Sequence, residues 1–513
     1  MHHTQFNTLP GALLGAVGGG FLVVLLAWVM GISPWQWQAT NIPMVNGKAG
    51  FELLCTNAMK RWKASSRDIV DEGFGKSRKG FYTITENGKE FILGPQYANT
   101  IRNDKRFNFY TYRVRTMHPN VPGLDVFDLD EMGKKLLRYV IGHKMTQNLS
   151  DLIKPLSEEA GDALEKIWTD SRDWHEVSVK QSVLAITSQQ STRVFLGREF
   201  CRDQRWLQIT TNVTIFAFQT VEAMRMWPSL LRPVVARLLP VCQKLRAETQ
   251  KARDIINPLV KQRRREKLKL TQEGKTPEPF LDTLEWAEEF ADGQEYDPAV
   301  LQLTIALSAM HNTTDFLTQL IYDLAARPEL IEELRREIIS VKQEYPWNKA
   351  AIFNLKLMDS VMKESQRLKP TGIVTMRRGA DATIEFPDGL TVQKGDLVIV
   401  STDNHRNPEI YPNPDEFDPY RFCRMIESPD QGKAAHLVST SENHLGFGHG
   451  TWACSGRFFA AAETKVALCH VLIKYDLKLI DDEPPAIVRN GSFTSANPLG
   501  TIAIRRRQEE VEL

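Results

Sequence analysis

Three long apolar stretches stand out along the chain, and they differ in their polar positions. Residues 11–32 (GALLGAVGGGFLVVLLAWVMGI) contain no charged side chain and are long enough to cross a bilayer once. Residues 298–325 are mostly apolar but carry hydroxyl and amide groups in their middle, which predicts a helix buried on most faces. After residue 456, apolar side chains recur at helical spacing as far as residue 473. The pattern predicts a membrane anchor followed by a mainly helical protein.

The first stretch favours a retained transmembrane helix over a signal peptide, because it is long and no basic segment precedes it. Tryptophans at positions 28, 35 and 37 gather at its C-terminal end, as interfacial anchors do. Lysine and arginine begin only at Lys48, which favours a cytosolic position for the remainder. We therefore expect a lumenal tail (1–10), an anchor (11–32), a linker (33–50) and one large domain (51–513).

Composition excludes several other classes of protein. The 513 residues carry a net charge of +1, so a general nucleic-acid binder is not indicated, and the basic run at 261–269 (KQRRREKLK) predicts a solvated helix face. Six cysteines are scattered without paired spacing, which indicates neither a disulfide framework nor a zinc site. Short alternating runs around 81–92, 383–400 and 487–504 predict small β-sheets and a closing hairpin.

The candidate chemistry is concentrated in residues 447–456 (FGHGTWACSG). Cys454 lies in a glycine-rich loop directly before a predicted helix, where backbone N–H groups and the helix dipole stabilise a thiolate. Gly448, Gly450 and Gly456 permit positive φ and close backbone approach, which a large flat cofactor against the loop requires. An ordinary buried thiol is the alternative interpretation.

This loop resembles the haem signature of the cytochrome P-450 family, F-x-x-G-x-(R/H)-x-C-x-G, at Phe447, Gly450, Cys454 and Gly456. The resemblance implies haem b, with Cys454 as the axial iron ligand and the other loop residues, Gly448 included, as cofactor-binding residues. Trp452 stands where the family has a basic residue on a haem propionate. An indole N–H can donate one hydrogen bond but carries no charge.

Two further stretches match the family in the expected order. Glu364 and Arg367 lie on one face of a predicted helix, and residues 414–422 (PDEFDPYRF) supply Arg421. The resemblance implies that these three side chains form a buried charge-paired triad that fixes the cysteine loop so that haem can be held. It also implies that Arg378 reaches a haem propionate and that His405 supports the haem-binding layer.

In the long central helix, residues 308–313 align with the family segment (A/G)-G-x-(D/E)-T-(T/S). His311 takes the acid position, Asn312 takes the alcohol position, and Thr313 follows. We expect these three residues to be catalytic by organising water for proton delivery. Local hydrogen bonds of the threonines to the preceding helical turn are the alternative.

The resemblance implies a cytochrome P-450 fold, mainly α with small β-sheets, as a haem domain over residues 51–513 behind a single-pass anchor in the endoplasmic reticulum membrane. Similarity to fungal enzymes of secondary metabolism implies a monooxygenase that oxidises an apolar terpenoid, indole diterpenoid, alkaloid or polyketide. Electrons would come from NADPH through NADPH–cytochrome P-450 reductase, for which we expect a basic footprint of Lys134, Lys135, Arg457 and Lys465.

Two other functions remain open at this stage. The altered pair at 311–312 is compatible with a haem-thiolate isomerase, dehydratase or ring-forming enzyme that inserts no oxygen. A non-catalytic haem-binding or sterol-sensing membrane protein is the third possibility.

Overall fold

A computed structural model describes residues 42–49, 52, 54–127 and 129–513 of the chain. The expected lumenal tail (1–10), the anchor (11–32) and the first part of the linker (33–50) lie outside these residues. Within the described ranges, no helix combines the length and the apolar character needed to cross a membrane.

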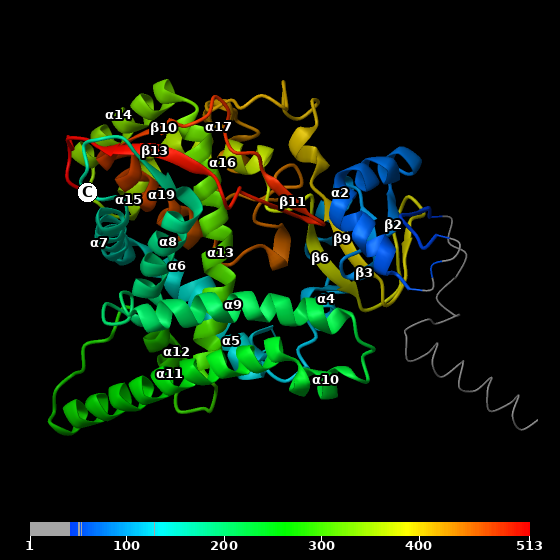
Figure 1. Cartoon of the computed structure of the whole chain (residues 1–513), viewed down its shortest axis with the longest axis horizontal. Helices are drawn as coiled ribbons and strands as arrows, with labels where there is room; N and C mark the ends of the chain where they lie inside the picture. Colours follow the sequence, from blue (N-terminus) through cyan, green and yellow to red (C-terminus); the bar gives the residue numbers. More distant parts are fainter. Residues whose placement is uncertain (1–41, 50–51, 53, 128) are drawn as a thin grey trace, which may run out of the picture.

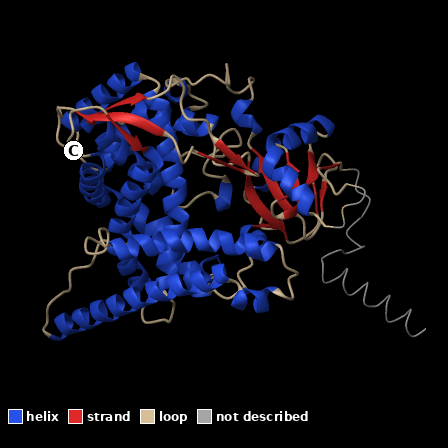
Figure 2. Ribbon diagram, in the orientation of Figure 1, coloured by secondary structure: helices blue, strands red, loops and turns tan. Residues whose placement is uncertain are grey.

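A large helical body lies beside a smaller region that is rich in strands (Figure 1, Figure 2). The main sheet has the order β1-β2-β3-β9-β6-β4. These strands are β1 (Met44–Val45), β2 (Gly80–Thr85), β3 (Gly88–Leu93), β9 (Leu397–Ser401), β6 (Val374–Ala380) and β4 (Phe107–Asn108). As expected, β2 and β3 form a hairpin, which turns at Gly88 with φ of 101°. Helix α2 (Thr56–Lys76) contacts β2, where Trp62 and Phe81 belong to one buried cluster.

The helical body accounts for most of the chain and confirms the mainly helical prediction. Its first half contains α3 (Ala98–Ile101), α4 (Phe109–Met117), α5 (Glu131–Tyr139), α6 (Met145–Gln147), α7 (Leu149–Trp168), α8 (Val179–Leu196), α9 (Gln204–Arg225), α10 (Arg232–Leu238), α11 (Pro240–Gln272) and α12 (Thr283–Ala291). Its second half contains α13 (Pro298–Ala325), α14 (Pro328–Glu344), α15 (Lys349–Asn354), α16 (Lys356–Leu368), α17 (Arg421–Ile426), α18 (Gly432–Ala435) and α19 (Arg457–Lys474). A π-helical turn, Val140–Lys144, joins α5 to α6.

Helix α13 runs through the middle of the body with α8, α11 and α19 packed around it (Figure 1). It begins where the Asp297 side chain accepts a hydrogen bond from the Val300 N–H, and Pro298 occupies its first turn. Leu317, Leu320 and Ile321 are fully buried. The predicted central helix is therefore confirmed with its predicted bounds.

Three small sheets complete the fold. One has the order β10-β13-β5, formed by β10 (Tyr475–Leu479), β13 (Thr501–Arg506) and β5 (His175–Ser178). The others pair β7 (Ile384–Glu385) with β8 (Thr391–Val392), and β11 (Val488–Asn490) with β12 (Phe493–Ser495). The β11–β12 hairpin turns at Gly491, which has φ of 58°, and confirms the predicted closing hairpin. It brings the C-terminal region back toward the middle of α13.

Candidate active site

An internal cavity lies between the start of α19 and the middle of α13. It contains about 1390 Å³ of space between atoms, part of it open to solvent. Much of its wall is apolar, including Leu137, Ile141, Met145, Phe195, Ile305, Phe316 and Phe459. Its polar lining includes Ser308, Asn312, Thr313, Asp315, Gln319, Gln366 and Cys454. A second hollow, which also borders Cys454 and Asn312, continues the space along β6.

Cys454 is exposed, and it borders both parts of this cavity. Its backbone N–H donates to the Phe447 carbonyl over 2.8 Å, while the Gly448 N–H donates to the Leu445 carbonyl over 2.8 Å. These two bonds close the loop into a compact turn in front of α19. The structure thus presents the predicted thiol to a cavity at the start of a helix.

The glycines of this loop have different roles. Gly448 and Gly450 have positive φ values of 69° and 75°, as their residue type permits. A Cβ on Gly450 would lie 2.3 Å from the Arg102 carbonyl oxygen. Glycine at position 450 is therefore required by close packing against the protein itself. Gly456 has negative φ and caps the N-terminus of α19.

The Cys454 side chain is exposed to the cavity but is surrounded by protein, and this desolvation raises the pKa of its thiol, while the Gly456 N–H and the charge of Arg457 act in the opposite direction. Arg457 Nη1 donates to the Cys454 carbonyl over 2.8 Å. The protein alone therefore favours the thiol, and a bound cation would favour the thiolate.

Helix α13 turns only part of its predicted catalytic segment toward the cavity. Ser308, Asn312 and Thr313 line it, with Ala309 leaving space between them. His311 does not line the cavity. Successive side chains of an α-helix diverge by about 100°, so the His311 side chain points away from the side of the helix that carries Asn312. Burial lowers the pKa of His311, with a further contribution from Lys180. The structure therefore brings two of the three predicted catalytic residues to the cavity.

Arg378 lies on the β6 side of the cavity and is 2% exposed. Its Nη1 donates to the Arg377 carbonyl over 2.8 Å, and its Nε has no partner within the described part of the chain. Burial lowers the pKa of its guanidinium to about 10. A buried guanidinium without a carboxylate is a site for an anion. Trp452 lines the same hollow and packs against Phe109 and Tyr110, with ring centroids 5.8 and 5.2 Å apart.

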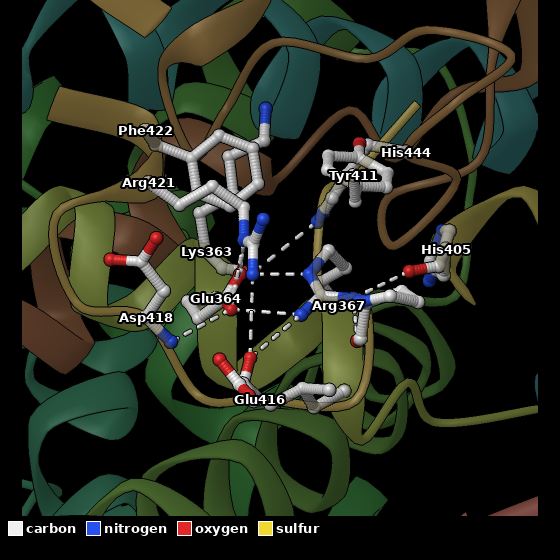
Figure 3. A network of polar contacts seen from close by, with 12 residues as sticks. Lys363, Glu364, Arg367, His405, Tyr411, Glu416, Asp418, Arg421, Phe422 and His444 are labelled. Carbon is white, nitrogen blue, oxygen red and sulfur yellow. Dashed lines mark hydrogen bonds and ion pairs between the residues drawn. The ribbon is translucent and has the colours of Figure 1, made fainter. Parts of the chain in front are cut away.

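The predicted triad of Glu364, Arg367 and Arg421 forms a buried ion network (Figure 3). Arg367 Nε and Nη2 each donate to the Glu364 carboxylate over 2.8 Å, and Arg421 Nε donates to it over 3.1 Å. The side chains of Glu364 and Arg367 are fully buried. None of the three lines the cavity, so their contribution is to hold the loops around it.

The sequence did not predict a role for two residues that contact the loop or the cavity. His449 is buried, and its ring lies within 3.2 Å of Arg102 Nη1 and 3.0 Å of Asn99 Oδ1. Asp315 lines the cavity and pairs with Lys180 of α8. His449 occupies a variable position of the loop signature, and Lys180 is far from Asp315 in sequence, so neither contact had a local signal.

The expected basic footprint was wrong at one position. Lys465 is 3% exposed, and its Nζ lies 2.7 Å from Asp359 Oδ1 and 3.1 Å from the Ile352 carbonyl. The helical period of α19 turns this lysine inward, where the carboxylate and carbonyl groups satisfy its charge. Lys135 is exposed, whereas Lys134 is partly buried and pairs with Glu131.

Comparison with known proteins agrees with this geometry. The family model for cytochrome P-450 matches residues 82–503. The chain is 54% identical to cytochrome P-450 monooxygenase olcG of Penicillium canescens, over 99% of this chain and 98% of that protein. It is 42% identical to cytochrome P-450 monooxygenase adrA of Penicillium rubens, over 92% and 93% of the two chains. It is 38% identical to cytochrome P-450 monooxygenase pyr3 of Aspergillus fumigatus, over 99% and 98%. This chain belongs to the cytochrome P-450 family.

Proposed function

We propose that this protein is a monooxygenase of fungal secondary metabolism that uses O2 and NADPH-derived electrons to oxidise an apolar substrate. One observation carries the proposal: Cys454, at the start of α19, borders the same cavity as Asn312 and Thr313 of α13. The relatives named above, all called monooxygenases, support the same activity.

Members of this family contain haem b and receive electrons from NADPH through a reductase, and this chain shares that cofactor and partner. When bound, the haem supplies the activation of O2 and the oxidation of the substrate. The residues around the cavity fit such a group. Cys454 would ligate the iron, and Arg378, whose Nε has no partner within the described part of the chain, would receive a propionate, with Trp452 beside it.

The protein side chains on α13 would control water and protons. The exposed amide of Asn312 and the hydroxyl of Thr313 can each hold a water molecule by donating and accepting hydrogen bonds. Neither group carries a charge, so each can move a proton only by exchange along hydrogen bonds. His311 does not line the cavity, so we assign it no part in holding this water.

The substrate is proposed to be a terpenoid, indole diterpenoid, alkaloid or polyketide. The support is the apolar part of the cavity wall, which would bury an apolar scaffold, together with the relationship to fungal enzymes. Thr494 and Ser495 of the β11–β12 hairpin are polar points in this wall that could orient one substrate group.

We also propose an endoplasmic reticulum membrane location, with the catalytic domain in the cytosol. The apolar run at 11–32 supports this location. A second support is the exposed apolar surface at the end of α9 and along α10, where Met226, Leu230 and Leu238 are 66%, 61% and 71% exposed. An ion pair between Lys63 and Glu222 places the end of α9 beside α2, on the side of the molecule where the described chain begins (Figure 1).

A CO-difference spectrum of the reduced wild-type protein and of Cys454→Ser tests the ligand assignment. We expect the band of thiolate-bound haem in the wild type and its loss in the variant. Incubation of candidate apolar metabolites with isotope-labelled O2, NADPH and reductase then tests the reaction. Product without the label would overturn the monooxygenase assignment, and a wild type without the thiolate band would overturn the site.

The membrane proposal has its own test. The full-length protein is reconstituted into vesicles that contain brominated lipid, and Trp227, 40% exposed in the apolar surface, serves as the probe. We expect the quenched part of the fluorescence to be smaller in Trp227→Phe, while quenching of the tryptophans at positions 28, 35 and 37 persists in both proteins. Equal quenching in both proteins would contradict membrane contact at this surface.

A further inference from the structure

His405 contacts the cysteine loop from the layer behind it. It lies in the 3-10 turn Asp403–Arg406 and is 2% exposed. Its Nε2 accepts a hydrogen bond from the Leu445 backbone N–H over 2.8 Å. A backbone N–H can only donate, so Nε2 must be unprotonated and the neutral ring must carry its proton on Nδ1. This Nδ1 has no partner within the described part of the chain.

A short series of backbone hydrogen bonds connects this contact to the thiol. The backbone N–H of Leu445 is bonded to His405, and the backbone carbonyl of Leu445 accepts a hydrogen bond from the Gly448 N–H over 2.8 Å. Between these two residues lies Phe447, whose carbonyl accepts from the Cys454 N–H over 2.8 Å. The position of the His405 ring therefore determines where the loop begins, and the turn that follows determines where Cys454 lies.

The backbone of His405 is held by the buried ion network, and its ring is held by a second histidine (Figure 3). Arg367 Nη1 donates to the His405 carbonyl over 2.6 Å, while Arg367 is also paired with Glu364. The His444 ring stacks on His405, with centroids 5.0 Å apart and planes 17° apart. Burial, together with the charges of Arg367 and Lys363, lowers the pKa of His405 to about 3. The ring is consequently fixed in place and stays neutral.

We propose that His405 is a positioning residue: its neutral ring, protonated on Nδ1, transmits the placement of the Glu364–Arg367 pair to the loop and aims the Cys454 sulfur into the cavity. This inference rests on the proposed function and extends it by assigning how thiolate ligation is maintained. A merely space-filling role would require the volume of the ring alone, whereas this role requires an acceptor at the position of Nε2.

The substitutions His405→Leu and His405→Gln separate these two roles. Leucine fills part of the space without an acceptor, while the glutamine amide oxygen can reach approximately the position of Nε2. His470→Leu is the matched control, because His470 is 3% exposed and its Nε2 bonds to Ser157 Oγ over 2.7 Å, not to the cysteine loop. Each full-length protein is purified with haem, and the fraction of its CO complex in the thiolate-bound form is measured, together with the thermal midpoint of unfolding.

We expect the ratio of thiolate-bound to thiol-bound complex to fall roughly 10-fold in His405→Leu, as for other groups that orient a metal ligand. His405→Gln should restore most of the ratio, and His470→Leu should retain the wild-type ratio even where its thermal midpoint falls equally. An unchanged ratio in His405→Leu, no restoration by glutamine, or an equal fall in His470→Leu would each overturn the proposal. If His405→Leu does not fold, the comparison of His405→Gln with His405→Met decides, with an equal ratio in the two overturning it. If the CO complex of the wild type shows no thiolate band, the proposed haem-thiolate function itself is wrong, independently of His405.

Discussion

Asp315 and Lys180 form an ion pair in the wall of the cavity, with Oδ1 and Nζ 2.6 Å apart. The other carboxylate oxygen of Asp315 accepts from the Ala496 N–H over 3.2 Å, and Lys180 donates to the Ala496 carbonyl over 3.4 Å. The pair therefore fastens the segment after β12 to α13 and α8. This segment borders the cavity, so a charged pair contributed by two helices helps to shape one of its walls.

The coupling between these two residues can be measured with a double-mutant cycle. The wild type, Asp315→Asn, Lys180→Met and the double variant are unfolded with urea, and the interaction energy follows from the four free energies of unfolding. The Asp315 and Lys180 side chains are 14% and 27% exposed, so we expect a coupling of about 1–2 kcal/mol, between the values for surface and buried pairs. A coupling near zero would show that Asp315 acts only through Ala496.

Substitutions of Asn312 and of His311 should differ in their effect on the amount of product formed per NADPH consumed. Asn312 lines the cavity and His311 does not, so only Asn312 can hold water beside the substrate. In a reconstituted system with substrate and reductase, Asn312→Ala should lower the product formed per NADPH by roughly 10-fold and raise hydrogen peroxide accordingly. His311→Ala is the control from the neighbouring position and should keep the wild-type ratio. An equal loss in both variants would contradict the assignment of roles.

The comparison of these neighbours shows where sequence reasoning succeeds. The loop at 447–456 and the helix at 298–325 were predicted correctly because each is a contiguous pattern with its own physical reason. The direction of a side chain toward a cavity depends on the helices packed around it, as with His311. The same limit explains Lys465, which resembles a surface lysine in sequence but is buried and paired with the partly buried side chain of Asp359 from α16.

Arg378 should control how tightly haem is retained. Its Nε has no partner among the described residues, and those that line the hollow beside it include no carboxylate; a charge-assisted hydrogen bond contributes about 1.5–3 kcal/mol. Arg378→Met should therefore increase the rate of haem transfer to apomyoglobin by roughly 10- to 100-fold, and Arg378→Lys should increase it less. The exposed Arg172→Met provides the control. Equal transfer rates for Arg378→Met and the wild type would exclude this residue from haem binding.

Glu463 should make the stability of the protein fall as pH rises. It is fully buried on α19, where burial raises the pKa of its carboxyl to about 8 from 4.5, although Ser191 donates to Oε1 over 2.6 Å. Between these two pKa values the unfolded chain has lost the proton that the folded chain keeps. The stabilisation is therefore complete below pH 4.5 and is lost as pH rises to about 8.

Urea unfolding at several pH values between 5 and 8 measures this effect, with an expected slope of at most about 1.4 kcal/mol per pH unit. Glu463→Gln keeps an acceptor for Ser191 and has no proton to lose, so it should flatten the slope and exceed the wild type in stability near pH 8. Glu278→Gln changes an exposed glutamate by the same atoms and should leave the slope as it is. A slope that persists in Glu463→Gln would show that another buried group takes up the proton, because the substituted side chain can no longer do so.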